Sequence, residues 1–240
     1  LAFDEKKIIS STGALSLERV PERLVVVGAG YIGLEMGSVW SRLGSSVTVV
    51  EFLDNIVPNV DLEIAKHFHR NLQKQGLNFM LGTKVIQADL NDKGVALLAE
   101  SVKGGSQQKI DCDVLLVAVG RKPSTDNLGL EELGVKRDKD GFLCVNDKLE
   151  TSVANILAIG DCIPGPMLAH KAEEDGVAAV EMIAGGSAHI DYNLVPSIIY
   201  THPEVASVGK TEEHLKSQNI DYNVGKFPFS ANSRARANDD

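Results

Sequence analysis

Residues 24–51 read LVVVGAGYIGLEMGSVWSRLGSSVTVVE, and this stretch decides the fold. A short apolar run over residues 24–27 predicts a strand, and a helical pattern follows over residues 32–43. Gly44 ends the helix, and a second β-branched run over residues 47–50 predicts another strand. A strand–helix–strand unit of about 30 residues places its two strands parallel, so the stretch predicts an α/β, Rossmann-type nucleotide-binding domain.

The turn between the first strand and the helix is a glycine fingerprint, Gly28-Ala29-Gly30-Tyr31-Ile32-Gly33. Gly28 permits the tight turn, Gly30 lets the backbone approach a pyrophosphate, and Gly33 lets helix and strand pack closely. The helix start adds free N–H groups and the positive end of the helix dipole, both of which favour phosphate. The fingerprint therefore predicts a dinucleotide site.

Two acids indicate which dinucleotide is bound. Glu51 lies 18 residues after Gly33, where a carboxylate accepts hydrogen bonds from a ribose 2′-hydroxyl and repels a 2′-phosphate. Residues 52–54 offer no cation to a 2′-phosphate, so we expect NAD rather than NADP. Glu35 could reach the nicotinamide end or could be a surface residue of the helix, and the sequence leaves both open.

Composition and charge exclude several classes of protein. A net charge of −9 argues against a nucleic acid or an anionic membrane as partner. No apolar run approaches the roughly 20 residues of a membrane helix, and residues 1–5 lack a signal-peptide pattern. The three cysteines have the spacing of neither a disulfide framework nor a metal site, so we expect buried free thiols and no metal. We also expect His67 and His69 to be solvated.

The rest of the chain is a succession of shorter elements. Residues 61–76 predict an amphipathic helix with Asp61 as its N-cap, and residues 172–183 and 212–218 predict two more helices, the last capped by Thr211. Residues 114–119 form an apolar run typical of a strand buried on both faces. Short strands are predicted at residues 79–81, 84–90, 95–102, 109–110, 141–145, 156–159, 198–200 and 205–208.

Further segments resemble the pyridine nucleotide–disulfide oxidoreductase family. Beside the fingerprint, they are SSTGAL at residues 10–15, VGRKP at 119–123, IGDC at 159–162, GPMLAHKAE at 165–173, YTHPEVA at 200–206 and KFPF at 226–229. Together they are most similar to the family members that oxidise dihydrolipoamide and reduce NAD, of the mitochondrial type. The resemblance implies a Rossmann-type NAD-binding domain over residues 1–123, part of the central FAD domain over 124–191, and the start of an α+β dimerisation domain over 192–240.

The resemblance also implies cofactor contacts, residue by residue. NAD would be bound by Gly28, Ala29, Gly30, Tyr31, Ile32, Gly33, Leu34 and Glu35, with Glu51 on its ribose, Val85 beside its adenine and Gly120 near the nicotinamide nucleotide. FAD would be bound by Asp161 at its ribityl chain, and by Met167, Leu168, Ala169 and His170 along the flavin. In such enzymes dihydrolipoamide reduces a reactive disulfide, FAD receives the electrons, and NAD takes the hydride.

Partners and location follow from the same resemblance. It implies lipoyl domains of 2-oxoacid dehydrogenase complexes as partners, a homodimer, and the mitochondrial matrix, although a bacterial cytoplasm suits the same motifs. The family's cysteine pair with four intervening residues is absent, as is its C-terminal His-Pro segment. We therefore expect a central piece of a longer protein, with no catalytic residue of its own and little retention of flavin alone.

Two other functions stay open at this point. One is another disulfide reductase of the family, such as glutathione or mercuric reductase, although Glu51 speaks against the members that use NADP. The other is a non-catalytic module that senses or stores NAD.

Overall fold

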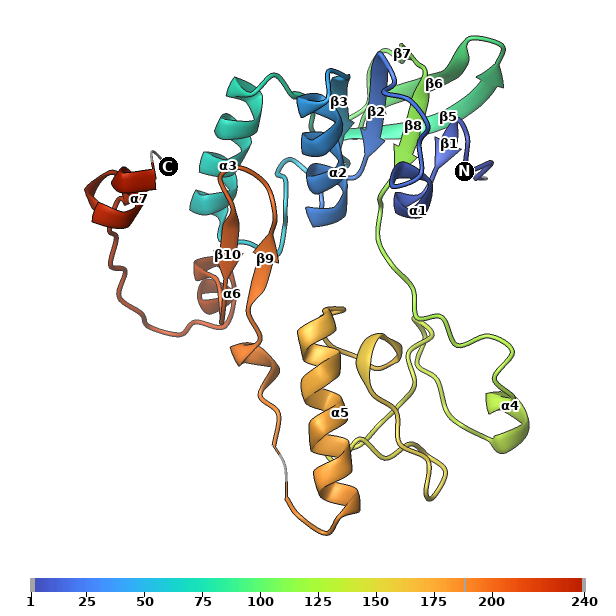
Figure 1. Cartoon of the computed structure of the whole chain (residues 1–240), viewed down its shortest axis with the longest axis vertical. Helices are drawn as coiled ribbons and strands as arrows, with labels where there is room; N and C mark the ends of the chain where they lie inside the picture. The colour runs from blue at the N-terminus through green and yellow to red at the C-terminus, as the bar shows by residue number, and fades with distance from the viewer. Residues whose placement is uncertain (1–2, 188, 239–240) are drawn as a thin grey trace. The chain divides into compact units, whose positions relative to one another are not determined.

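The computed structural model describes residues 3–187 and 189–238 (Figure 1). The chain forms two compact units. The first contains the chain up to Gly120, residues Ile198–Ala206 and the chain from Lys210, and the second contains Arg121–Ser197 and Ser207–Gly209. Most of residues 192–240 therefore belong to the first unit. The predicted domain boundaries after residues 123 and 191 stay predictions.

A parallel sheet forms the centre of the first unit (Figure 1). Within the described chain its order is β1-β8-β2-β3-β4. These strands are Ile8–Ile9 (β1), Arg23–Val27 (β2), Ser46–Val50 (β3), Asn78–Met80 (β4) and Val114–Val117 (β8). Val26 lies opposite Val49 on one side and Leu116 on the other. The strands predicted from the continuous apolar runs are confirmed, because a strand covered on both faces needs apolar side chains on both.

Helices cover this sheet. They are Ser11–Ala14 (α1), Tyr31–Arg42 (α2) and Leu62–Lys74 (α3). The α2 helix buries Leu34 and Trp40, and α3 buries Phe68 and Leu72. Asp61 caps α3 as predicted, since its side chain accepts a hydrogen bond from the Glu63 amide.

An antiparallel sheet adds a second layer to the first unit. It consists of Thr83–Asn91 (β5), Gly94–Ser101 (β6) and Gln108–Cys112 (β7), and the pairing of β5 with β6 is interrupted by a bulge between Val85 and Gln87. Val95 and Leu97 of β6 share an apolar cluster with Val25 and Val50 of the parallel sheet. Through this cluster the antiparallel sheet packs against the central strands of the parallel sheet.

The last segment begins with a small sheet, Ser197–Ile199 (β9) paired with Val205–Ser207 (β10). Ile199 and Val205 belong to the core of the first unit. Helix Glu212–Ser217 (α6) follows, capped by Thr211 as predicted. The described chain ends with a 3₁₀ turn, Phe229–Ala231 (η3), and helix Ser233–Asn238 (α7).

The second unit has little regular structure apart from one long helix. Its elements are Leu130–Leu133 (α4), Gly160–Cys162 (η1), Ala169–Ile183 (α5) and Tyr192–Leu194 (η2). The strands predicted at residues 141–145 and 156–159 are wrong, because single bridges form there instead, Arg137 with Leu143 and Glu150 with Leu157. Left-handed backbone at Gly141, Leu149 and Asn155 turns the chain before a ladder can extend.

Two expectations about side chains also need correction. Cys112 is buried, but Cys144 is exposed and Cys162 is partly exposed, so buried thiols were the wrong prediction for two of the three. His69 is not solvated: its ring centroid lies 4.4 Å from that of Phe79, because β4 brings Phe79 beneath α3. Among the described helices, none is long and apolar enough to cross a membrane, and the described side chains form no cluster suited to a metal ion.

Candidate functional site

The fingerprint lies where β2 ends and α2 begins, at the carboxyl edge of the parallel sheet (Figure 1). Gly28 has φ +103°, and a Cβ there would be 2.4 Å from the carbonyl oxygen of Ala118, just past the end of β8. A Cβ at Gly33 would be 2.2 Å from the carbonyl oxygen of Gly28. Both positions therefore require glycine for the close approach of backbone to backbone.

Gly30 is different, because a Cβ built there meets no described atom within 4 Å. Its φ of −76° is one that any residue adopts. Packing within the chain therefore gives no reason for glycine here. Open space beside the backbone is what a pyrophosphate approaching the fingerprint needs, so this position fits a bound dinucleotide.

The first turn of α2 is open to an anion. Gly30 is the N-cap and offers no side chain, and the first helical bond runs from the Leu34 amide to the Gly30 carbonyl oxygen. The amides of Tyr31, Ile32 and Gly33 precede that bond and are the free donors of a helix start. Their alignment with the helix dipole favours a phosphate at this end.

Glu51 is held against the fingerprint. One carboxylate oxygen accepts a hydrogen bond from the Ala29 amide at 2.7 Å, and the other accepts one from the Leu53 amide at 2.8 Å. The carboxylate is thereby fixed between the end of β3 and the glycine loop. Each oxygen keeps a second lone pair, which a ribose hydroxyl could use.

Glu35 has a partner that the sequence did not indicate. Its carboxylate accepts a hydrogen bond of 2.8 Å from the amide of Tyr200, the residue after β9. Both interpretations of Glu35, as a nicotinamide contact and as a surface residue of the helix, stay predictions. Sequence spacing carries no signal for a bond between residues 165 positions apart.

Gly120 and Val85 are the two other residues predicted to contact NAD. Gly120 has φ +137° and comes two residues after Ala118, whose carbonyl oxygen lies against Gly28. Val85 lies in β5 opposite Ala99, and its half-buried side chain packs on the cluster between the two sheets. The sequence analysis did not single out Gly37, which lies one helical turn after Gly33. A Cβ built at Gly37 would lie 3.5 Å from Cγ1 of Val47, so glycine lets α2 pack closely on β3.

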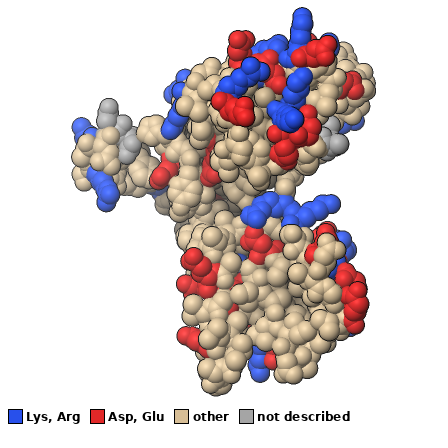
Figure 2. Space-filling model, turned by 45° about the vertical axis from the view of Figure 1, so that its right-hand side comes forward, with Lys and Arg blue, Asp and Glu red and all other residues tan. Residues whose placement is uncertain are grey.

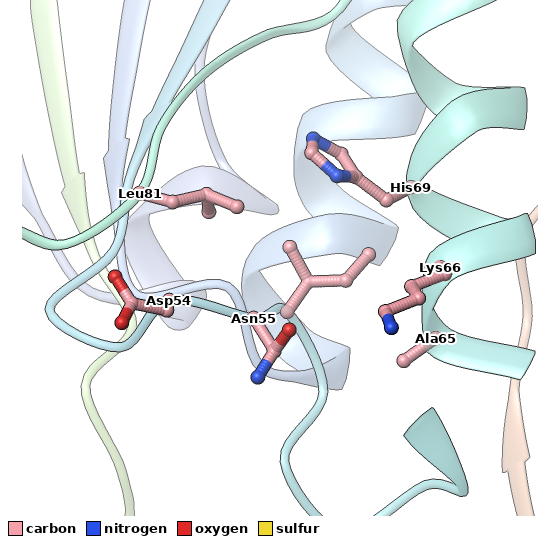
Figure 3. Close-up of a pocket in the computed structure, with 7 residues that line it drawn as sticks. Asp54, Asn55, Ala65, Lys66, His69 and Leu81 are labelled. Carbon is pink, nitrogen blue, oxygen red and sulfur yellow. The ribbon is translucent and has the colours of Figure 1, made fainter. Parts of the chain in front are cut away.

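A small cavity lies beside this edge (Figure 3). Its volume is about 20 Å³, which is room for one water molecule and far too little for a nucleotide. Its lining residues are Asp54, Asn55, Ile56, Ala65, Lys66, His69 and Leu81. His69 Nε2 has no hydrogen-bond partner among the described residues, and burial lowers the pKa of His69. The candidate NAD site is therefore the open fingerprint loop and not this cavity.

In the second unit, Asp161 and Met167 are brought together by Arg121. The guanidinium donates to the Asp161 carboxylate at 2.6 Å and to the Met167 carbonyl oxygen at 3.4 Å. Arg121 was missed as a site residue, although it lies inside the family segment VGRKP. The Asp161 carboxylate is 37% exposed, which leaves it accessible to a ligand hydroxyl.

The start of α5 also suits a polar ligand. Leu168 is the N-cap without a capping side chain, and the first helical bond runs from the Ala172 amide to the Leu168 carbonyl oxygen. The amides of residues 169–171 are therefore free donors of a helix start. The exposed His170 ring is held by a 2.7 Å hydrogen bond between Nε2 and the Pro196 carbonyl oxygen. These features fit the flavin contacts predicted for Met167, Leu168, Ala169 and His170.

Comparison with known proteins gives the chain a family. Residues 1–176 match the model of the pyridine nucleotide-disulphide oxidoreductase family, and residues 195–240 match the dimerisation domain of that family. A mitochondrial dihydrolipoyl dehydrogenase of Arabidopsis thaliana is 61% identical over 239 residues, which are 100% of this chain and 47% of the relative. A mitochondrial dihydrolipoyl dehydrogenase of Cricetulus griseus is 58% identical over 242 residues, with 100% and 48% covered.

The fold is also found in solved structures. The HOCl-induced flavoprotein disulfide reductase RclA of Escherichia coli superposes with a TM-score of 0.86 at 30% identity, over 98% of this chain and 53% of that one. The chain thus spans about half the length of the curated relatives it matches.

Proposed function

The chain belongs to the pyridine nucleotide-disulphide oxidoreductase family, and from that premise we propose that it is the nucleotide-binding part of an enzyme that oxidises dihydrolipoamide and reduces NAD. FAD and NAD are the cofactors of this family. The observation that carries the proposal is identity of 58–61% to dihydrolipoyl dehydrogenases of a plant and a mammal over the whole chain.

We assign the binding of NAD to the first unit. The amides of Tyr31, Ile32 and Gly33 would bind the pyrophosphate, and the open space at Gly30 admits it. Glu51 would accept a ribose hydroxyl while staying bonded to the Ala29 amide, and its charge would repel a 2′-phosphate. Val85, Gly120 and Glu35 would complete the site at the adenine and nicotinamide ends.

We assign contacts with FAD to the second unit. Asp161 would accept a ribityl hydroxyl, with the hydrogen bond from Arg121 orienting the carboxylate. The free amides at the start of α5 would donate to the flavin. Bound FAD supplies two-electron redox chemistry, and this chain's residues orient it and exclude water.

The chemistry on the dithiol is assigned to no residue of this chain. Cys112, Cys144 and Cys162 do not have the spacing of the family's reactive pair. Burial raises the pKa of Cys112 to about 12, so its thiol is not a nucleophile at neutral pH. We propose that the chain contributes binding and orientation of the two cofactors to the reaction.

Partners and location belong to the same proposal. We assign residues 195–240 to a homodimer interface, on the match to the family's dimerisation domain. Lipoyl domains of 2-oxoacid dehydrogenase complexes would present the dithiol substrate. The relatives named as mitochondrial support a location in the mitochondrial matrix.

One preparation tests the proposal in two steps. We expect NADH to bind the chain and to quench or shift its fluorescence, with NADPH binding at least about tenfold more weakly because of Glu51. We further expect dihydrolipoamide-dependent reduction of NAD, and a flavin absorption band at ~450 nm, from the enzyme of which this chain is proposed to be the nucleotide-binding part. Preference for NADPH, or NADH binding in a source protein inactive with dihydrolipoamide, would contradict the assignment and favour the two alternatives given above.

A further inference from the structure

A buried ion pair in the second unit consists of two side chains to which no cofactor contact is assigned above. Lys171 and Asp175 lie one turn apart on α5, both side chains are 0% exposed, and Lys171 Nζ lies 2.7 Å from Asp175 Oδ2. Taking two charges out of water costs free energy that a pair recovers only with good geometry and additional hydrogen bonds. The additional bonds of this pair therefore indicate its role.

Both charges bond to Gly160. Lys171 Nζ donates to the Gly160 carbonyl oxygen at 3.0 Å, and Asp175 Oδ2 accepts a hydrogen bond from the Gly160 amide at 2.9 Å. Gly160 has φ +71°, and a Cβ there would be 3.2 Å from the Ala172 Cβ. Glycine has many accessible conformations, so the two bonds to the ion pair select this one.

Tyr192 completes the network. Its hydroxyl donates to Asp175 Oδ1 at 2.9 Å, and Lys171 Nζ lies 4.9 Å from the centre of its ring. Burial, together with the bond to Asp175, raises the pKa of Tyr192 to about 12, so the hydroxyl stays a neutral donor. Both carboxylate oxygens and the ammonium are thus satisfied, which is the condition for a buried network to specify one geometry.

We propose that Lys171, Asp175 and Tyr192 are positioning residues that fix the Gly160–Asp161 turn relative to the first turn of α5. These are the two segments assigned to FAD, so the inference rests on the proposed function for its ligand. Asp161 directly follows Gly160, and His170 directly precedes Lys171. An apolar pair could fill the same volume, but it could not bond to either polar group of Gly160.

The test uses the full 240-residue chain and three variants. K171M/D175L replaces both charges with apolar groups, so that neither is left buried alone. Y192F removes one hydrogen bond and keeps the ion pair. K216M is the matched control, because Lys216 pairs with Glu212 at the same i,i+4 spacing but on the exposed face of α6.

The first measurement is hydrogen exchange of the Gly160 amide, with global stability measured by denaturant unfolding. In K171M/D175L we expect exchange at least about tenfold faster than in the wild type once global stability is taken into account, and the wild-type rate in K216M. An unchanged Gly160 rate in a folded K171M/D175L protein overturns the proposal. If that variant does not fold, Y192F decides by the same criterion, with an expected increase of about threefold.

The second measurement is the dissociation constant for FAD, from quenching of flavin fluorescence and corrected for the folded fraction. We expect binding about tenfold weaker in K171M/D175L and about threefold weaker in Y192F, with no change in K216M. Unchanged affinity in the folded variants would make the network structural only and overturn its positioning role. A wild-type chain that binds no FAD agrees with the little retention of flavin expected of this piece alone. The exchange of Gly160 then decides on the network, and the proposed function is decided by the binding of NADH.

Discussion

The two compact units each place a glycine turn before a helix, but they hold that turn in different ways. In the first unit Glu51 accepts a bond from the Ala29 amide, and the loop continues strands bonded on both sides. In the second unit Asp175 accepts a bond from the Gly160 amide, and the chain from 121 to 187 forms single bridges instead of a ladder.

The difference shows what a sheet provides. Where the loop follows a strand that is bonded on both sides, close glycine packing and one hydrogen bond to Glu51 set the loop's path. Where no ladder exists, a buried ion pair holds the same kind of turn, as Lys171 and Asp175 do at Gly160. In Figure 2 the charged side chains that can be seen are scattered over a mostly uncharged surface, whereas both side chains of this pair are fully buried.

The largest effect we expect concerns the thiols of the two units. Burial in the first unit raises the pKa of Cys112 from 9.0 to about 12, a reduction of the thiolate of about a thousandfold. Cys144 is exposed in the second unit. A thiol reagent at pH 8 should therefore modify Cys144 rapidly and Cys112 only as the protein unfolds. Because Cys162 is also partly exposed, the C144S/C162S variant should lose the fast phase. A native rate for Cys112 equal to that of Cys144 would show that the core around Cys112 is open to the reagent.

A methyl group at Gly33 should damage the sheet-supported turn next. The Cβ of Gly33→Ala would meet the Gly28 carbonyl oxygen at 2.2 Å, so either the loop or α2 must move. We expect a loss of about 3 kcal/mol of stability and binding of NADH weakened by about a hundredfold.

Gly30→Ala is the control for that change, because its Cβ meets nothing and its backbone is ordinary. It should keep the stability within about 1 kcal/mol while still weakening NADH, since the methyl group takes the space assigned to the pyrophosphate. Denaturant unfolding and NADH titration separate the two effects. Wild-type affinity in Gly30→Ala would place the pyrophosphate elsewhere.

Glu51→Gln should have a moderate effect that sharpens the role of charge in the first unit. The amide keeps one acceptor oxygen, so only one of the bonds from Ala29 and Leu53 survives. We expect NADH to bind about tenfold more weakly and the preference over NADPH to shrink. Glu18→Gln makes the same substitution at an exposed site and should change neither constant. Retained preference in Glu51→Gln would contradict the specificity argument.

The smallest effect is expected at the opposite edge of the parallel sheet. Burial alone would raise the pKa of Asp113, but hydrogen bonds from the Arg23 guanidinium and amide outweigh it and leave the pKa below 3.8. A lowered folded pKa gives stability that is complete above 3.8 and is lost as the pH falls through the folded value. Asp113→Asn should lower the Tm by at most about 2 °C at pH 7. The difference should vanish in acid, and one that grows instead would contradict this sign.

Local sequence was sufficient for the buried parallel strands and the helix caps of the first unit. The buried strands around Val26, Val49 and Leu116 follow from β-branched runs, and the caps Asp61 and Thr211 follow from residue type at a helix start. Prediction failed in the second unit, where left-handed residues border the apolar runs at 141–145 and 156–159: Gly141 begins the first, and Asn155 and Gly160 flank the second. A short apolar run predicts that its side chains are buried, but it does not predict whether a partner strand exists.

The sequence by itself determined the fingerprint, its glycines and the carboxylate that answers it, because those requirements are local in chain or in the strand–helix–strand unit. Only the tertiary structure decided that Glu35 bonds to Tyr200, that Arg121 joins Asp161 to Met167, and that Lys171 and Asp175 are buried. The first two bonds join residues 165 and 40 positions apart, and the burial of the ion pair depends on bonds to Gly160 and Tyr192, which lie outside its helix. A charged residue in the sequence of a helix is usually exposed to solvent. It is buried only where the fold provides hydrogen-bond partners for its polar atoms in place of water.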